Sequence, residues 1–106
     1  MRFLLTAKLD TQYANKAVED GTMGAKIQAM MQALKPEAAY FFEDDGVRTT
    51  MLIVDMADAS RIPSFTEPFF LGMNARVTLR AVMTAEDLGK AGLPDLAKTW
   101  GSSRVW

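Results

Sequence analysis

The chain has 106 residues, of which 49% are hydrophobic and 24% are charged, a composition typical of one soluble globular domain. The formal net charge is −1, so no overall positive field attracts the chain to nucleic acid or to anionic lipid. Histidine and cysteine are absent, which excludes a disulfide framework, thiolate metal sites and Ser–His or Cys–His catalytic pairs. No apolar run is long enough to span a membrane, and Phe3–Leu5 is too short for a signal-peptide core, so we expect a cytoplasmic protein.

The first third of the chain predicts a strand followed by helix. The segment Arg2–Leu9 is typical of a strand, and Asp10 offers a capping oxygen to a short helical segment after it. A longer helix is expected from Met23 to about Lys35, because Pro36 disfavours helical geometry in the residue before it. Its apolar residues recur on one side, where we expect them to fill the core: Met23, Ile27, Met30, Met31 and Leu34.

A β-hairpin is predicted next. The runs Ala38–Glu43 and Val47–Met56 are typical of strands, and Asp-Gly between them favours a type I′ turn with Asp45 and Gly46 at its centre. That turn determines the register. The expected opposite pairs are Asp44–Val47, Glu43–Arg48, Phe41–Thr50 and Tyr40–Met51. Glu43 and Arg48 are then expected to form a solvent-exposed ion pair.

The third section predicts a second helical region and a fourth strand. The helical region opens near Asp58, with Pro63 suited to a first helical position. Because Pro68 removes a backbone donor from the interior, we expect a kinked or two-part helix. Asn74 provides a stop signal, and Ala75–Met83 is expected to form a strand.

The element order strand, helix, strand, strand, helix, strand predicts an α+β, ferredoxin-like βαββαβ domain with an antiparallel sheet and both helices on one face. The other face would carry Leu4, Thr6, Lys8, Arg76, Thr78 and Arg80. The hairpin would add either Tyr40, Phe42, Met51 and Ile53, or Phe41, Leu52 and Val54, and the pattern leaves both sets open. Both sets are largely apolar, so we expect a second copy of the chain to cover this face in a homodimer.

Three segments carry a family resemblance: 36–41, 44–49, and the run from Ile62-Pro63 to Glu67-Pro68. With them, residues 1–88 resemble the dimeric α/β-barrel superfamily, which includes YCII-related proteins, antibiotic-biosynthesis monooxygenases and muconolactone isomerases. The chain looks most like a small bacterial branch of that superfamily. The resemblance implies that two open sheets pack face to face and enclose a barrel. It implies no particular reaction, because the histidines used by several of its groups are absent here.

Four residues are candidates for ligand binding. Lys8, Arg76 and Arg80 occupy polar positions of the first and last strands, which neighbour each other in a ferredoxin-like sheet. If they share the barrel face, they would suit a small organic carboxylate, with arginine supplying bidentate contacts. Tyr40 could serve as a hydroxyl partner or proton donor. Alternatively, the cations pair with Glu67, Asp55 or Glu43, or with the second subunit.

Three functions remain open from the sequence. The chain is a cofactor-independent enzyme (isomerase, lyase or oxygenase) acting on a small anionic organic molecule, or a non-catalytic binding module, or an assembly protein with a filled barrel. We expect no cofactor, because no phosphate-binding glycine loop is present. We expect no metal either, because the run Glu43–Asp45 lacks the spaced ligands of a calcium loop. No catalytic residue can be assigned.

The single domain is expected to have a core at residues 1–83 and a C-terminal extension at 84–106. Thr84 and Asp87 resemble a capping box, while Gly89 and Gly92 weaken the helix that follows. The extension is rich in large apolar side chains: Leu88, Leu93, Leu96, Trp100 and Trp106. We therefore expect it to pack across a barrel end or onto the partner subunit, anchored by Trp100.

Overall fold

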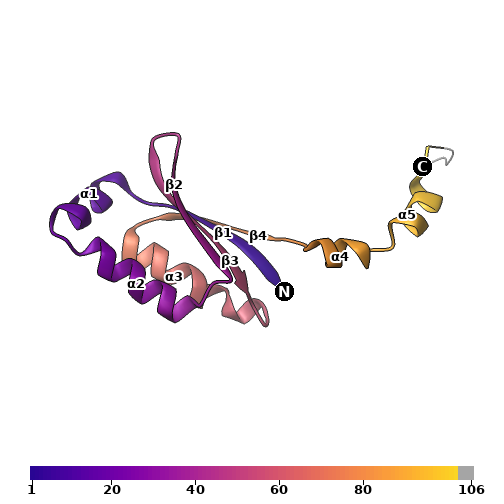
Figure 1. Cartoon of the computed structure of the whole chain (residues 1–106), viewed down its shortest axis with the longest axis horizontal. Coiled ribbons are helices and arrows are strands. Elements are labelled where there is room, and N and C mark those ends of the chain that lie inside the picture. The colour runs from indigo at the N-terminus through magenta and orange to yellow at the C-terminus, as the bar shows by residue number, and fades with distance from the viewer. Residues whose placement is uncertain (103–106) are drawn as a thin grey trace.

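A computed structural model describes residues 1–102. In this part of the chain, four strands form one antiparallel sheet and five α-helices accompany it, an α+β arrangement (Figure 1). The elements are β1 (Arg2–Lys8), α1 (Thr11–Glu19), α2 (Met23–Leu34), β2 (Ala38–Asp44), β3 (Val47–Asp55), α3 (Ile62–Met73), β4 (Arg76–Ala81), α4 (Ala85–Gly89) and α5 (Leu93–Trp100).

The sheet has the strand order β2-β3-β1-β4, so β1 and β4 are neighbours, as the sequence predicts. Helices α2 and α3 lie side by side on one face of the sheet (Figure 1). The core forms between them and that face, and its largest fully buried side chains are Phe69, Leu5, Leu52, Met56, Met73 and Val54. This arrangement is compatible with a ferredoxin-like fold. Among residues 1–102, no helix packs on the opposite face of the sheet.

The β2–β3 hairpin has the predicted register, with Glu43 opposite Arg48 and Tyr40 opposite Met51. Asp45 and Gly46 have φ of 54° and 78°, the positive values that a type I′ turn requires. The predicted ion pair between Glu43 and Arg48 is wrong, because each side chain has another partner. Glu43 accepts a hydrogen bond from the Gly46 N–H (2.9 Å), and Arg48 donates to Asn15 of α1 (2.8 Å).

Capping and packing explain the first two helices. The carboxylate of Asp10 accepts a hydrogen bond from the Tyr13 N–H (2.9 Å) at the start of α1. The apolar side of α2 packs on the core as predicted, with Leu34 buried and Met30 among the half-buried residues. The helix ends at Leu34, and its C-cap residue Lys35 has a left-handed φ of 46°.

Pro68 does not divide the second helical region. Helix α3 runs unbroken through it, and the separate piece is a 3₁₀ turn at Ala59–Arg61, before Pro63. Proline at this position removes one backbone hydrogen bond, whereas Phe65, Phe69 and Met73 are all buried along the same helix. Their burial stabilises α3, so the two-part alternative is wrong, while the kinked alternative stays a prediction.

After β4 the chain leaves the sheet as an extended arm, which we define as residues 82–102. Figure 1 shows α4 and α5 pointing away from the sheet and its helices. The chain has a radius of gyration of 18.3 Å and extents of 62 × 29 × 21 Å, against about 13 Å expected for a compact chain of this length. The predicted capping box is present, since Thr84 and Asp87 bond reciprocally at 3.0 and 3.1 Å. The arm does not fold back on its own sheet, and Trp106 lies outside the described residues.

Candidate functional site

The strand register decides which hairpin residues line the uncovered face. Directly opposite residues of an antiparallel pair share a face. Leu52 pairs with Leu5, and both are fully buried beneath the helices, so the set containing Leu52 belongs to the core. The uncovered side, which we call the open face, therefore carries the other set: Tyr40, Phe42, Met51 and Ile53, beside Leu4, Thr6, Lys8, Arg76, Thr78 and Arg80.

The open face is apolar on one side and cationic on the other. Strands β2 and β3 contribute aromatic and aliphatic residues, of which Tyr40 is 62% exposed and Phe42 is 41% exposed. Strand β4, at the opposite edge of the sheet, contributes Arg76 and Arg80, both exposed. A ligand or partner on this face would therefore contact apolar surface and a positively charged edge together.

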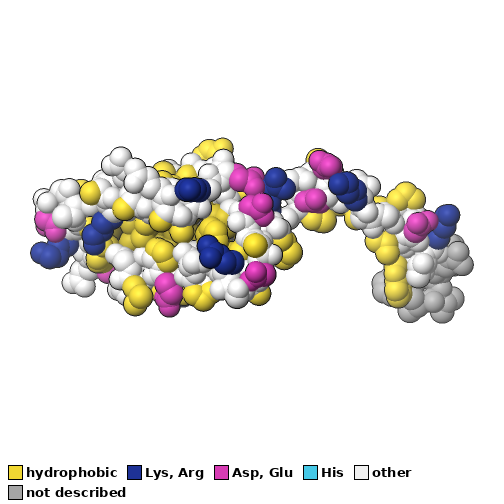
Figure 2. Space-filling view, turned by 90° about the horizontal axis from the view of Figure 1, so that it is seen from below, with side chains coloured by type: hydrophobic (Ala, Val, Ile, Leu, Met, Phe, Trp, Pro, Cys, Tyr) yellow, Lys and Arg dark blue, Asp and Glu magenta, His cyan; other side chains and the backbone are white. Residues whose placement is uncertain are grey.

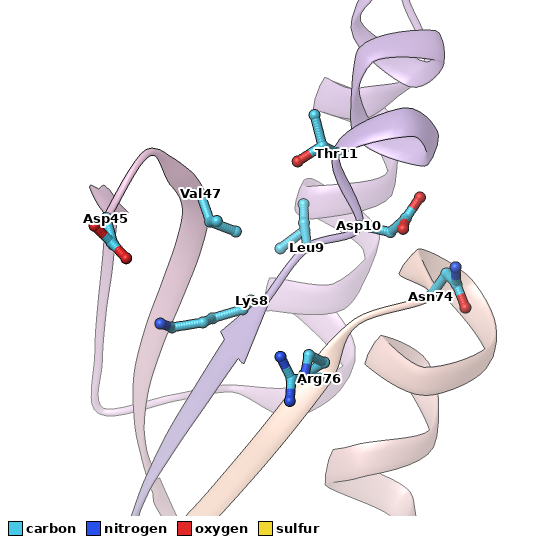
Figure 3. A pocket seen from close by; sticks show the side chains of 8 residues that line it. All are labelled: Lys8, Leu9, Asp10, Thr11, Asp45, Val47, Asn74 and Arg76. Atoms are coloured by element: carbon cyan, nitrogen blue, oxygen red, sulfur yellow. The ribbon is translucent and has the colours of Figure 1, made fainter.

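The two cations Lys8 and Arg76 meet at one end of this face. They are direct partners across β1 and β4, and both line a pocket of about 390 Å³ (Figure 3). That volume lies within the usual range for small-molecule sites. The other lining residues are Leu9, Asp10, Thr11, Asp45, Val47 and Asn74.

The two cations differ in their pairing. Lys8 forms an ion pair with Asp44 (3.1 Å), so the alternative partners Glu67, Asp55 and Glu43 are wrong for this residue. Phe42 pairs with Thr49, and Thr49 pairs with Lys8, so these residues lie side by side across β2, β3 and β1. Asp44 follows Phe42 by two residues on β2. Arg76 has no ion-pair or hydrogen-bond partner for its side chain within residues 1–102. Its guanidinium can therefore take an external anion without breaking a bond to those residues.

Arg80 and Tyr40 share the open face with this pair but do not lie beside it. Arg80 is opposite Leu4, four residues along β4 from Arg76, which is about 13 Å in a strand. Tyr40 belongs to β2, at the other edge of the sheet, about 14 Å from β4 across three strand spacings. One small ligand at the Lys8–Arg76 end cannot contact all four predicted residues.

Several residues of the pocket were missed from the sequence. Asp10 and Asn74 line it (Figure 3), and each marks the junction between a helix and a strand: Asp10 caps α1, and Asn74 ends α3 with a φ of 48°. The signal that could have found them is topological, because the end of β1 and the start of β4 lie side by side at one end of the sheet. With Asp10 and Asp45 beside the two cations, the pocket has mixed charge. Leu9 and Val47 add apolar lining, so the pocket suits a molecule with one acidic group and a small apolar remainder.

A second pocket, of about 440 Å³, lies at the other end of the sheet and includes Arg2, Asp55 and Asp87 among its lining residues. Here the charges are already engaged. Arg2 donates to both carboxylate oxygens of Glu37 at 3.0 Å, and this hydrogen bond raises the pKa of Arg2 above its ordinary value. The Thr84 N–H lowers the pKa of Asp87 in the same region. This end is therefore less suited to an anion than the Lys8–Arg76 end.

Comparison with known proteins finds no family model that matches the chain and no significant match among curated proteins. In the part of the chain that the structure describes, no group of three or more acidic side chains could hold a metal ion. No helix in residues 1–102 is both long and apolar enough to cross a bilayer.

Proposed function

We propose that the chain forms a homodimer through the open face, as a ferredoxin-like subunit of a dimeric α/β barrel. The apolar side chains of β2 and β3 support this proposal, because a monomer would leave Tyr40, Phe42 and their neighbours in water. A second copy suits the surface, since a two-fold interface covers the same residues in both subunits. The resemblance of residues 1–88 to the superfamily agrees with this assembly.

Within this dimer, the proposed role is binding of a small organic anion at the Lys8–Arg76 end of the open face. The observation that carries it is the position of Arg76: exposed, directly opposite Lys8, beside a pocket, and without a partner among residues 1–102. A guanidinium binds carboxylate bidentately, and the pocket residues Leu9 and Val47 would add apolar contact. The preferred ligand is therefore a small aromatic or alkyl carboxylate.

The non-catalytic binding module and the cofactor-independent enzyme differ in one respect: only the enzyme converts the bound acid to a product. The described pocket residues hold carboxylates that could move protons, Asp10 and Asp45, but Asp10 already accepts a hydrogen bond from Tyr13. An assembly protein with a filled barrel is the third outcome. It would retain the dimer and bind no acid.

The proposal is tested by calorimetric titration of the purified dimer with a panel of small acids, including benzoate, salicylate and short-chain carboxylates. Neutral amides of the same acids serve as matched controls for apolar contact. Binding of acids but not of amides supports an anion site, and product analysis of the same mixtures separates an enzyme from a binding module. Failure of every acid to bind at millimolar concentration would contradict the proposal and favour the assembly role.

A further inference from the structure

The arm carries leucine side chains that are partly exposed within residues 1–102. Leu88, Leu93 and Leu96 are 45%, 52% and 47% exposed. In α5, Leu93, Leu96, Ala97 and Trp100 follow the i, i+3, i+4, i+7 spacing of one helix face, while Asp95 and Lys98 form an ion pair outside this set (3.8 Å). Figure 2 shows hydrophobic side chains on the arm, separated from the body by a narrow junction.

These helices are too short to be stable by themselves. Helix α4 has five residues and α5 has eight, whereas isolated helices shorter than about 12–15 residues are marginal in water. Gly92, which separates them, has a φ of 73° and redirects the chain. The arm therefore needs packing partners, and it points away from the surfaces of its own subunit (Figure 1).

We propose that the arm of each copy packs on the second copy, so that the two subunits of the homodimer exchange arms. This inference rests on the proposed dimer. The described arm has 21 residues, 82 to 102, and their apolar side chains would add to the interface that the open face forms. Reciprocal exchange also satisfies two-fold symmetry, because each subunit gives one arm and receives one.

The arm starts at a position that suits an exchange of arms between the two subunits. The Val82 N–H still bonds to the Arg2 carbonyl (3.1 Å), so the arm leaves directly from the edge strand β4. Met83, the next residue, is 65% exposed. The arm thus begins at the end of edge strand β4, beside the open face, and residues 82–84 join this strand to α4.

Isotope-mixed cross-linking of the full-length protein tests the exchange. Isotopically light and heavy copies are refolded together and treated with a lysine-reactive cross-linker, and the linked peptides are identified by mass spectrometry. The arm carries Lys90 and Lys98, and the body carries Lys8, Lys16, Lys26 and Lys35. Exchange predicts arm-to-body links that join one light and one heavy peptide. Arm-to-body links found only within single copies, or no such links at all, would overturn it.

A pair of variants measures how much the arm contributes to the assembly. Leu93→Glu with Leu96→Glu places charge on the apolar side of α5, and light scattering should then report a mass nearer to 11.7 kDa than to twice that value. Thr99→Glu adds charge to the same helix outside the apolar set and should leave the dimer intact. A double variant that keeps both the dimer mass and the arm-to-body links between copies contradicts packing of the arm through its apolar side. Helix α5 lies far from Arg76, so these variants do not test the anion site. If the unmodified protein binds no acid, the proposed anion binding fails, and the result says nothing against arm exchange.

Discussion

Lys8 and Arg76 lie directly opposite each other on β1 and β4, and only Lys8 has an ion-pair partner among residues 1–102, Asp44 at 3.1 Å. Two cations at adjacent positions repel each other, and Asp44, together with Asp10 and Asp45 of the pocket lining, offsets part of that repulsion. An anion placed between them would relieve it further. This unbalanced pair is the structural basis of the proposed anion site.

Arg76→Ala should weaken binding of a small aromatic acid by about 1.5–3 kcal/mol, the usual contribution of a charged hydrogen bond. Isothermal calorimetry measures the change. Arg80→Ala is the matched control, because it removes the same group from the same face about 13 Å away and should have a smaller effect. Equal affinities of the Arg76→Ala variant and the parent protein would show that Arg76 does not contact the acid.

Phe42→Glu should dissociate the proposed dimer, since Phe42 lies on the open face and a charge there would be buried against the second subunit. Phe41→Glu is a matched control. Phe41 is adjacent, similarly exposed at 51%, and lies on the opposite side of the sheet. Sedimentation velocity at micromolar concentration distinguishes the two variants. Dissociation by both, or by neither, would argue against an interface on the open face.

Much of this fold could be predicted from local signals. Asp45-Gly46 determined the hairpin register because both residues adopt positive φ, and Asp10 and the Thr84–Asp87 box marked helix starts. Which side of the hairpin faces the helices could not be predicted, because both sides are apolar. The choice depends on long-range pairing of Leu52 with Leu5.

The candidate site was harder to predict than the strands that carry it. The sequence identified Lys8 and Arg76 by residue type and strand position, yet Asp44 as the partner of Lys8 depends on how the hairpin lies beside β1. Asn74 was expected only as a helix stop. Its place in the pocket follows from the meeting of two chain segments far apart in sequence, which no local pattern reports.

Gly46→Ala should lower the free energy of unfolding by about 1–2 kcal/mol, because a side chain disfavours the left-handed φ of 78°. No steric clash contributes, since nothing lies within 4 Å of the added Cβ. Gly24→Ala is the control: the same atom is added in open space, but inside α2, where it should stabilise by about 0.4–1 kcal/mol. Urea denaturation followed by circular dichroism measures both, and equal signs for the two variants would contradict this account.

The capping box of α4 predicts a local response to acid. Hydrogen bonds from the Thr84 backbone N–H and side chain lower the pKa of the Asp87 carboxyl below its ordinary value of 3.8. A carboxyl with a lowered folded-state pKa stabilises the fold at pH values above its unfolded-state pKa, and this contribution is lost as the pH falls through the folded-state value. Helix α4 should therefore lose its cap below about pH 4, seen as faster amide exchange at residues 87–90.

Asp87→Asn should remove this pH dependence while leaving that of the Asp58 turn, whose carboxyl pKa is also lowered by Ser60. If amide exchange in α4, corrected for its intrinsic pH dependence, stays constant between pH 6 and pH 3 in the unmodified protein, the Asp87 carboxylate does not hold this helix start.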